Sequence, residues 1–141
     1  MLQLTKILRF EMAHAIFGYD GDCKNIHGHS YELHVTVTSV VDYKNYIPAP
    51  GFFIDFKNLK KLMHETVIEK FEHKLVLSRE FLKVNPSFLS QENLIEMDVE
   101  PSAENLLIYI SQLLKDKLPD EIKLVRLKLF ETKDSYAEWN D

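Results

Sequence analysis

Cys23-Lys24-Asn25-Ile26-His27-Gly28-His29-Ser30-Tyr31 places a single thiol just ahead of a His-Gly-His, and an alternating run begins at its end. Apolar and polar residues alternate from Tyr31 onward, and this period of two predicts a half-buried strand from about His29 to Val41. Residues two apart in an extended chain share a face, so His27 and His29 can direct both imidazoles at one point. The glycine between them has no side chain and lets a ligand or another backbone approach closely.

A third histidine is expected from the first strand. The segment from Leu2 to Ala13 also alternates, interrupted only by Lys6, and His14 lies at its far end. If this strand pairs antiparallel with the strand after His29, the end of the first lies beside the start of the second, and His14 falls next to the His-Gly-His. Imidazole is the commonest metal ligand in proteins. Three histidines with no obvious fourth protein ligand suggest a zinc ion with an open, catalytic position.

Two other interpretations fit the same spacing. Cys23 as a fourth ligand would close the site and make it structural. Alternatively, the histidines serve as acid–base groups or as solvated polar positions of a strand. Spacing alone leaves all three open.

Size and composition limit the class of protein. The chain has 141 residues, of which 45% are hydrophobic, enough for one domain over residues 1–141 with its own core. A formal net charge of -5 without a Lys/Arg run argues against a nucleic-acid binder. One cysteine makes no internal disulfide, the first residues lack a signal-peptide layout, and no apolar run approaches a membrane span. We therefore expect a cytoplasmic protein that binds neither nucleic acid nor membrane.

The middle of the chain is predicted to hold one helix and an irregular region. Residues 43–50 form a turn or hairpin tip, and Gly51 to Asp55 returns as a short strand. Asp55 stands at the N-cap of an amphipathic helix that reaches about Phe71. Leu75 to Glu100 has no clean period and is predicted to be a loop region, with a short strand near Leu94 to Met97.

The last third is predicted to hold a helix and a strand. Pro101-Ser102-Ala103-Glu104 is a helix start, with Ser102 as the N-cap or Pro101 just ahead of it, and Pro119 ends the helix. Ile122 to Thr132 is a strand that carries Val125, Leu127 and Leu129 on one side. This order predicts an α+β domain, an antiparallel sheet with both helices on one face. The uncovered face and edges of such a sheet make self-association a reasonable expectation.

Six segments, in this order along the chain, resemble the motifs of the 6-pyruvoyltetrahydropterin and 6-carboxytetrahydropterin synthase family. One such motif is weak, but six in order are strong, and together they span nearly the whole chain. They are Phe10–His14, Cys23–His29 (C-x3-HGH), Gly51–Phe56, Glu72–His73, Pro101–Asn105 and Glu131–Thr132.

The resemblance implies a fold and an assembly. The family's tunnelling fold is an antiparallel four-stranded sheet with two helices on one side. Three subunits form a barrel, and two barrels stack into a hexamer with active sites between subunits. A homo-oligomer, a hexamer built as a dimer of trimers, is therefore expected.

The resemblance also implies a metal centre. His14, His27 and His29 would hold zinc, which would bind the hydroxyls of the substrate side chain as a Lewis acid. Cys23, as thiolate, would remove or relay protons at the adjacent carbon centre.

Four further residues receive roles by the same resemblance. His73 would relay the proton, with Glu72 holding its ring. Glu131 would anchor the pterin, because a carboxylate accepts two parallel N–H bonds from an amino-pyrimidinone edge. Glu104 would support that pocket, although an acid in the first turn of a helix also has a sufficient structural explanation.

The spacing within the motifs favours one branch of the family. The short C-x3-HGH resembles bacterial 6-carboxytetrahydropterin synthases of the queuosine pathway, whereas 6-pyruvoyl enzymes generally have a longer gap. The expected reaction converts 7,8-dihydroneopterin triphosphate to 6-carboxy-5,6,7,8-tetrahydropterin, with loss of acetaldehyde and triphosphate. The alternatives are 6-pyruvoyltetrahydropterin synthesis and a non-catalytic zinc- or pterin-binding module. Glu72, where the family usually has the shorter aspartate, keeps the binding module open.

Overall fold

Two long strands form the centre of the molecule. In the computed structural model, which describes residues 1–141, β1 (Gln3–His14) and β2 (His27–Ser39) pair antiparallel along their whole length. Their register sets His14 opposite His27 and Met12 opposite His29. The two strands predicted from alternation are thereby confirmed to within two residues at their ends, and so is their antiparallel pairing.

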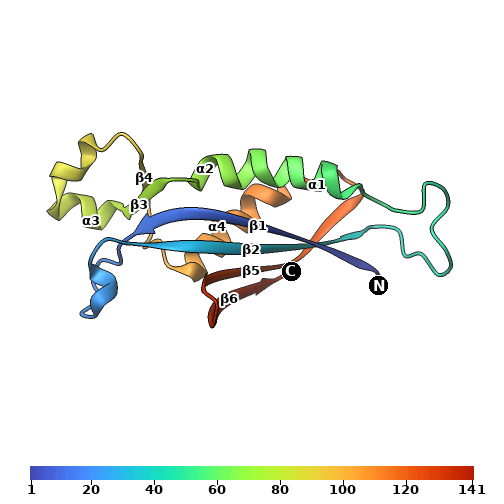
Figure 1. Ribbon diagram of the computed structural model, residues 1–141, viewed down its shortest axis with the longest axis horizontal. Coiled ribbons are helices and arrows are strands. Elements are labelled where there is room, and N and C mark those ends of the chain that lie inside the picture. Colours follow the sequence, from blue (N-terminus) through green and yellow to red (C-terminus); the bar gives the residue numbers. More distant parts are fainter.

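Four shorter strands extend this pair into a curled sheet (Figure 1). β5 (Ile122–Thr132) and β6 (Ser135–Asn140) add antiparallel on the β2 side, whereas β3 (Lys74–Ser78) and β4 (Leu94–Met97) add parallel on the β1 side. The sheet has six strands in the order β4-β3-β1-β2-β5-β6. The α+β class is confirmed, but the prediction of four strands, all antiparallel, is wrong.

The predictions for residues 51–55 and for Leu75 to Glu100 are also wrong. Residues 51–55 contain no strand, because both edges of β2 are already occupied by β1 and β5. The region predicted as mainly loop contains β3, the helix α3 (Arg79–Val84) and a 3₁₀ turn, η3 (Pro86–Ser90), in addition to the expected strand β4.

The predicted helices and both of their caps are present. α1 (Phe56–Met63) continues through a π turn, η2 (His64–Ile68), into α2 (Glu69–Phe71). The Asp55 carboxylate accepts from the Lys57 amide at 2.8 Å. α4 (Ala103–Lys115) begins with the Ser102 hydroxyl accepting from the Asn105 amide at 3.2 Å. No helix is long and apolar enough to cross a membrane.

The main core lies between one face of the sheet and these helices. A bulge in β5 shapes it: Thr36 pairs with Arg126 and Val37 with Leu124, so Val125 is the extra residue. Val125 therefore leaves the core row that was predicted for it, and Leu124 takes its place with Leu127 and Leu129. The same cluster holds Leu8, Phe10, Met12, Tyr31, Leu33, Val35, Val37, Leu59, Met63, Val67, Phe71, Leu106, Leu107, Ile110 and Leu114.

Candidate active site and metal centre

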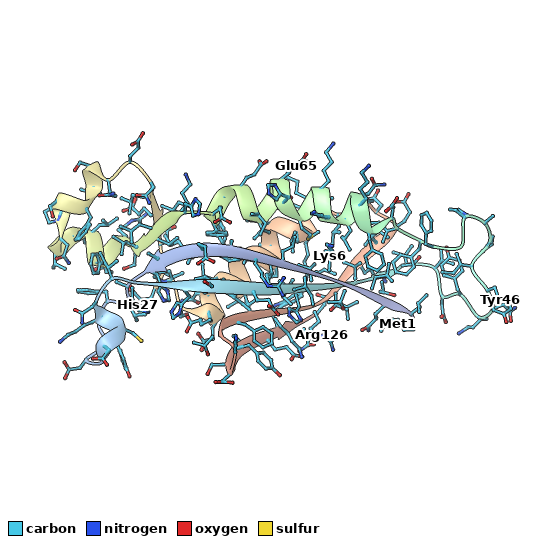
Figure 2. The ribbon with its side chains drawn as sticks, in the orientation of Figure 1. Met1, Lys6, His27, Tyr46, Glu65 and Arg126 are labelled. Atoms are coloured by element: carbon cyan, nitrogen blue, oxygen red, sulfur yellow. The ribbon has the colours of Figure 1, made fainter.

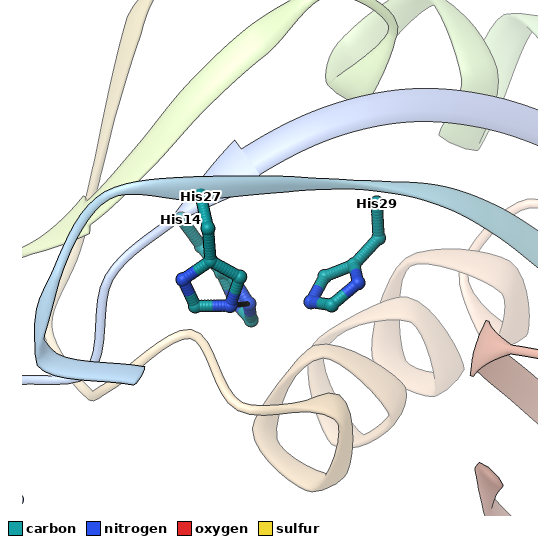
Figure 3. A group of neighbouring side chains, drawn as sticks. All are labelled: His14, His27 and His29. Carbon is teal, nitrogen blue, oxygen red and sulfur yellow. Dashed lines mark hydrogen bonds between the residues drawn. The ribbon is translucent and has the colours of Figure 1, made fainter. Parts of the chain in front are cut away.

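The three histidines converge at one end of the core. His27 and His29 continue the buried row of β2, and His14 continues that of β1, so all three point to the helix-covered side. Figure 3 shows their rings on the same side of β2. One ligand atom from each ring lies within 4.8 Å of the other two. The convergence predicted from strand pairing is confirmed.

Backbone carbonyls fix the orientation of two rings. His14 Nδ1 donates to the Pro101 carbonyl at 2.7 Å, and His27 Nδ1 donates to the Asn25 carbonyl at 2.7 Å. Each neutral ring carries one N–H, so both Nε2 atoms carry lone pairs. These two Nε2 atoms are 3.0 Å apart. Facing lone pairs at this distance repel one another unless a cation lies between them.

The third ring supplies an unsatisfied atom. His29 Nε2 is buried and has no hydrogen-bond partner, a costly state for a polar atom. Burial, the largest cause in each case, lowers the pKa of His14 and of His29, which keeps both rings in the neutral form that binds metals. Nitrogen ligands of a tetrahedral zinc ion stand about 3.3 Å apart, given Zn–N bonds of about 2.0–2.1 Å. The separation of the His14 and His27 nitrogens is near this value and the third nitrogen lies within 4.8 Å, so the three imidazoles form a candidate site for such an ion.

A cavity of about 510 Å³ adjoins this cluster. It is lined by His14, Cys23, Glu104 and Glu131, so four of the predicted site residues meet in one place. Cys23 is exposed and lies in the short 3₁₀ turn η1 (Asp22–Lys24). The volume is that of a small-molecule site.

Glu131 lies between the cavity and the imidazoles. Its two carboxylate oxygens are 3.9 Å from His14 Nε2 and 4.0 Å from His29 Nε2. The side chain is about one-third exposed, at 31%. The carboxylate therefore remains accessible to a ligand in the cavity.

Glu72 and His73 lie elsewhere. Glu72 Oε1 is 3.0 Å from His73 Nε2 and accepts from the Glu11 amide at 3.3 Å, so the longer carboxylate does reach the ring. The His73 side chain is 79% exposed and lines a second hollow, whose lining also includes Glu11 and His29. Within one chain, the structure does not bring this pair to the cavity that holds Cys23.

Two supporting residues were missed by sequence reasoning. The Tyr31 hydroxyl is 3.4 Å from His14 Nδ1, and its ring packs edge-on against that of His29, with centroids 5.3 Å apart. Tyr31 had been recognised only as an apolar position of the alternation. The Pro101 carbonyl, which holds His14, gives no sequence signal because any residue supplies a carbonyl.

Comparison with known proteins identifies the family. The model of the family described as 6-pyruvoyl tetrahydropterin synthase matches residues 3–141. The chain belongs to this family.

Relatives in the 6-pyruvoyl tetrahydropterin synthase family match along nearly the whole chain. A 6-carboxy-5,6,7,8-tetrahydropterin synthase from Rickettsia bellii is 28% identical over 142 residues, which cover 98% of this chain and 99% of the relative. The Haemophilus influenzae protein of that name is 26% identical over 145 residues, covering 100% of both chains. A 6-pyruvoyl tetrahydrobiopterin synthase from Pongo abelii is 32% identical over 114 residues, covering 79% of this chain and 66% of the relative.

Solved structures support the fold. The 6-pyruvoyl tetrahydropterin synthase of Caenorhabditis elegans superposes with a TM-score of 0.69 at 20% identity, covering 99% of this chain and 95% of that one. An uncharacterized protein from Wolinella succinogenes gives 0.79 at 16% identity, covering 99% and 98%. At this identity the likeness concerns the fold alone.

Proposed function

We propose that this chain is a zinc-dependent lyase. It would convert 7,8-dihydroneopterin triphosphate and one water molecule to 6-carboxy-5,6,7,8-tetrahydropterin, acetaldehyde and triphosphate. The observation that carries the proposal is a cluster of three metal-competent imidazoles, one of which, His14, lines the same cavity as Cys23 and Glu131. Two relatives of matching length bear the name of this activity, and the short C-x3-HGH spacing agrees with it.

Each residue at the cavity has a chemical task. A zinc ion held by His14, His27 and His29 would supply Lewis-acid polarisation of the substrate hydroxyls. Cys23, exposed at the cavity wall, would accept and return protons as the thiolate. Glu131 would take two N–H bonds from the edge of the pterin ring, a pairing that fixes the orientation of the ring. Glu104, on the cavity wall in the first turn of α4, would support the same pocket.

The position of Glu72 and His73 favours a shared active site. Glu72 and His73 contact each other at 3.0 Å, but His73 lines a different hollow from Cys23. We propose that chains assemble into a hexamer, a dimer of trimers, in which His73 of one subunit serves the Cys23 cavity of its neighbour. Glu72 would orient that ring, as a carboxylate orients the histidine of a triad.

A second reaction has an observation in its favour. The relative with the highest of the three identities given above, at 32%, is named a 6-pyruvoyl tetrahydrobiopterin synthase. In that reaction triphosphate leaves and no carbon is lost. The same residues would serve, so the two candidates differ in product rather than in site.

Mass spectrometry of the products separates the candidates. Zinc-loaded protein incubated with 7,8-dihydroneopterin triphosphate should give the 6-carboxy product with acetaldehyde. A 6-pyruvoyl product would transfer the protein to the second candidate. The 6-carboxy product would assign the protein to queuosine biosynthesis, a cytoplasmic pathway in our proposal.

The variant Cys23→Ala separates catalysis from binding. An enzyme of the proposed kind should lose turnover and keep its zinc and its affinity for pterin. A loss of zinc would make Cys23 a ligand instead, and unchanged behaviour would point to a binding module.

A further inference from the structure

Hydrogen bonds hold both ends of the loop that carries Cys23. The Ile16 amide donates to the Cys23 carbonyl at 2.8 Å, which closes the loop on itself. The Phe17 amide donates to the Glu100 carboxylate at 2.7 Å. Glu100 precedes Pro101, whose carbonyl holds His14. The loop is therefore held in a fixed position relative to the metal centre.

Tyr19 lies inside this loop and lines the same cavity as Cys23 and Glu131. Its side chain is accessible, with the residue 57% exposed. A second tyrosine on the cavity wall, Tyr136, already packs against Phe130, with ring centroids 4.5 Å apart and planes tilted by 31°, and has the Lys128 ammonium 4.9 Å from its ring centroid. No aromatic or cationic partner contacts the ring of Tyr19. Of the two rings, that of Tyr19 is the one free to stack on a planar ligand.

The ring of Tyr19 packs against the backbone of Gly21. A Cβ at position 21 would lie 2.3 Å from Cε1 and 2.7 Å from Cζ of Tyr19, far inside contact distance. The backbone of Gly21 has φ -105° and ψ -174°, an extended conformation that any residue adopts. The missing side chain, and not backbone freedom, is what this position supplies to Tyr19.

We propose that Tyr19 is a substrate-binding residue whose ring, seated on Gly21, covers one face of the pterin while Glu131 holds its edge. This inference rests on the proposed function, because it takes the ligand to be a pterin. Aromatic stacking on a heterocycle is tolerant of ring substituents, so Tyr19 would contribute affinity for the bicyclic ring and leave its orientation to Glu131.

The test is the binding of neopterin, a fluorescent probe, to zinc-loaded protein by fluorescence anisotropy. Tyr19→Ala should weaken binding about tenfold, whereas Tyr19→Phe should bind within about twofold of the unmodified chain, because the ring face is kept. Gly21→Ala should also weaken binding, because its methyl group displaces the ring. In the Tyr19→Ala background, Gly21→Ala should have no further effect, since the two changes act through one contact.

The control is Tyr46→Ala, which removes a 98% exposed tyrosine from the loop at the opposite end of the molecule from His27 (Figure 2). Unchanged binding by Tyr19→Ala, equal losses for Phe and Ala, or independent effects of the two loop variants would each overturn the proposal. So would a change in assembly state by sedimentation that accompanies the weaker binding, because Tyr19 would then be a subunit contact. If the unmodified zinc-loaded protein does not bind neopterin, the proposed function itself fails.

Discussion

His14 and His27 each commit one ring nitrogen to a backbone carbonyl and leave the other for a metal. The convergence of the three rings follows from strand alternation and pairing, so the sequence was sufficient to predict it. The tautomer of His14 was not predictable, because the carbonyl that fixes it lies 87 residues away in the chain. Strand patterns thus predict which side chains converge, whereas a hydrogen bond to a backbone carbonyl far along the chain leaves no signal in the sequence.

Removing one ligand should abolish tight zinc binding. In His29→Ala we expect the zinc dissociation constant to rise by more than the roughly 10–100-fold that loss of an outer-shell partner costs. His34→Ala is the matched control, because His34 lies on the opposite face of the same strand and pairs with Glu32 at 2.7 Å. Competition with a chromophoric chelator gives both constants. Equal zinc affinity in the two variants would remove His29 from the site.

The metal-free protein should lose stability below about pH 6.5, the ordinary pKa of histidine. Burial lowers the pKa of His14 and of His29 in the folded state, so the unfolded chain binds protons that the folded chain refuses. The free energy of unfolding should be insensitive to these groups above that pH. It should fall by at most about 1.4 kcal/mol per pH unit for each histidine below it.

Urea unfolding at several pH values measures this dependence. His34→Ala should keep the slope, whereas His29→Asn should reduce it. A metal-free protein equally stable on both sides of pH 6.5 would contradict the assignment.

At the scale of elements, the junction between α2 and β3 holds the only non-glycine residue with a positive φ, His73. His73 follows the helix with φ of 58°, a left-handed conformation that favours glycine, and its amide donates to the Glu11 carbonyl at 2.7 Å. If His73 has the proposed catalytic role, the unfavourable backbone conformation is the cost of placing its side chain.

His73→Gly should therefore raise the free energy of unfolding by about 1 kcal/mol while turnover is lost. His73→Ala, which keeps the unfavourable conformation, should lose turnover without this gain. Urea unfolding and product formation, measured on both variants, check the pair of effects. A stabilised and fully active His73→Gly would show that the histidine has no part in the reaction.

The short strands show where sequence patterns fail. β3 is buried along most of its length and pairs parallel on both sides, so it reads as an apolar run without alternation. β6 is short, polar and half exposed, and only its pairing with β5 defines it. The apolar residues at 51–55 form no strand, because β2, which precedes them in the chain, already has β1 and β5 on its two sides. Strand formation at these places depends on neighbours that local patterns do not encode.

At the scale of the whole molecule, the proposed active site needs residues that line two different hollows. The linings of the Cys23 cavity and of the His73 hollow share no residue, although His14 lines the first and His29 the second. The expectation of subunit-shared sites came from the family resemblance, and the position of His73 gives it a physical reason.

Mixing two inactive variants should restore activity. If one subunit supplies Cys23 and its neighbour supplies His73, an equal mixture of Cys23→Ala and His73→Ala chains, unfolded and refolded together, should regain about a quarter of the original turnover. Each variant refolded alone is the control and should stay inactive. No regain in mixtures that sediment as proper assemblies would place both residues in one subunit's site or exclude one of them.

The most direct test of the account is the product of metal-free protein before and after one equivalent of zinc is added back, followed by mass spectrometry on 7,8-dihydroneopterin triphosphate. We predict no turnover without metal, and 6-carboxy-5,6,7,8-tetrahydropterin with acetaldehyde once zinc is bound. Turnover in the metal-free protein, or none with zinc bound at the three histidines, would contradict the account.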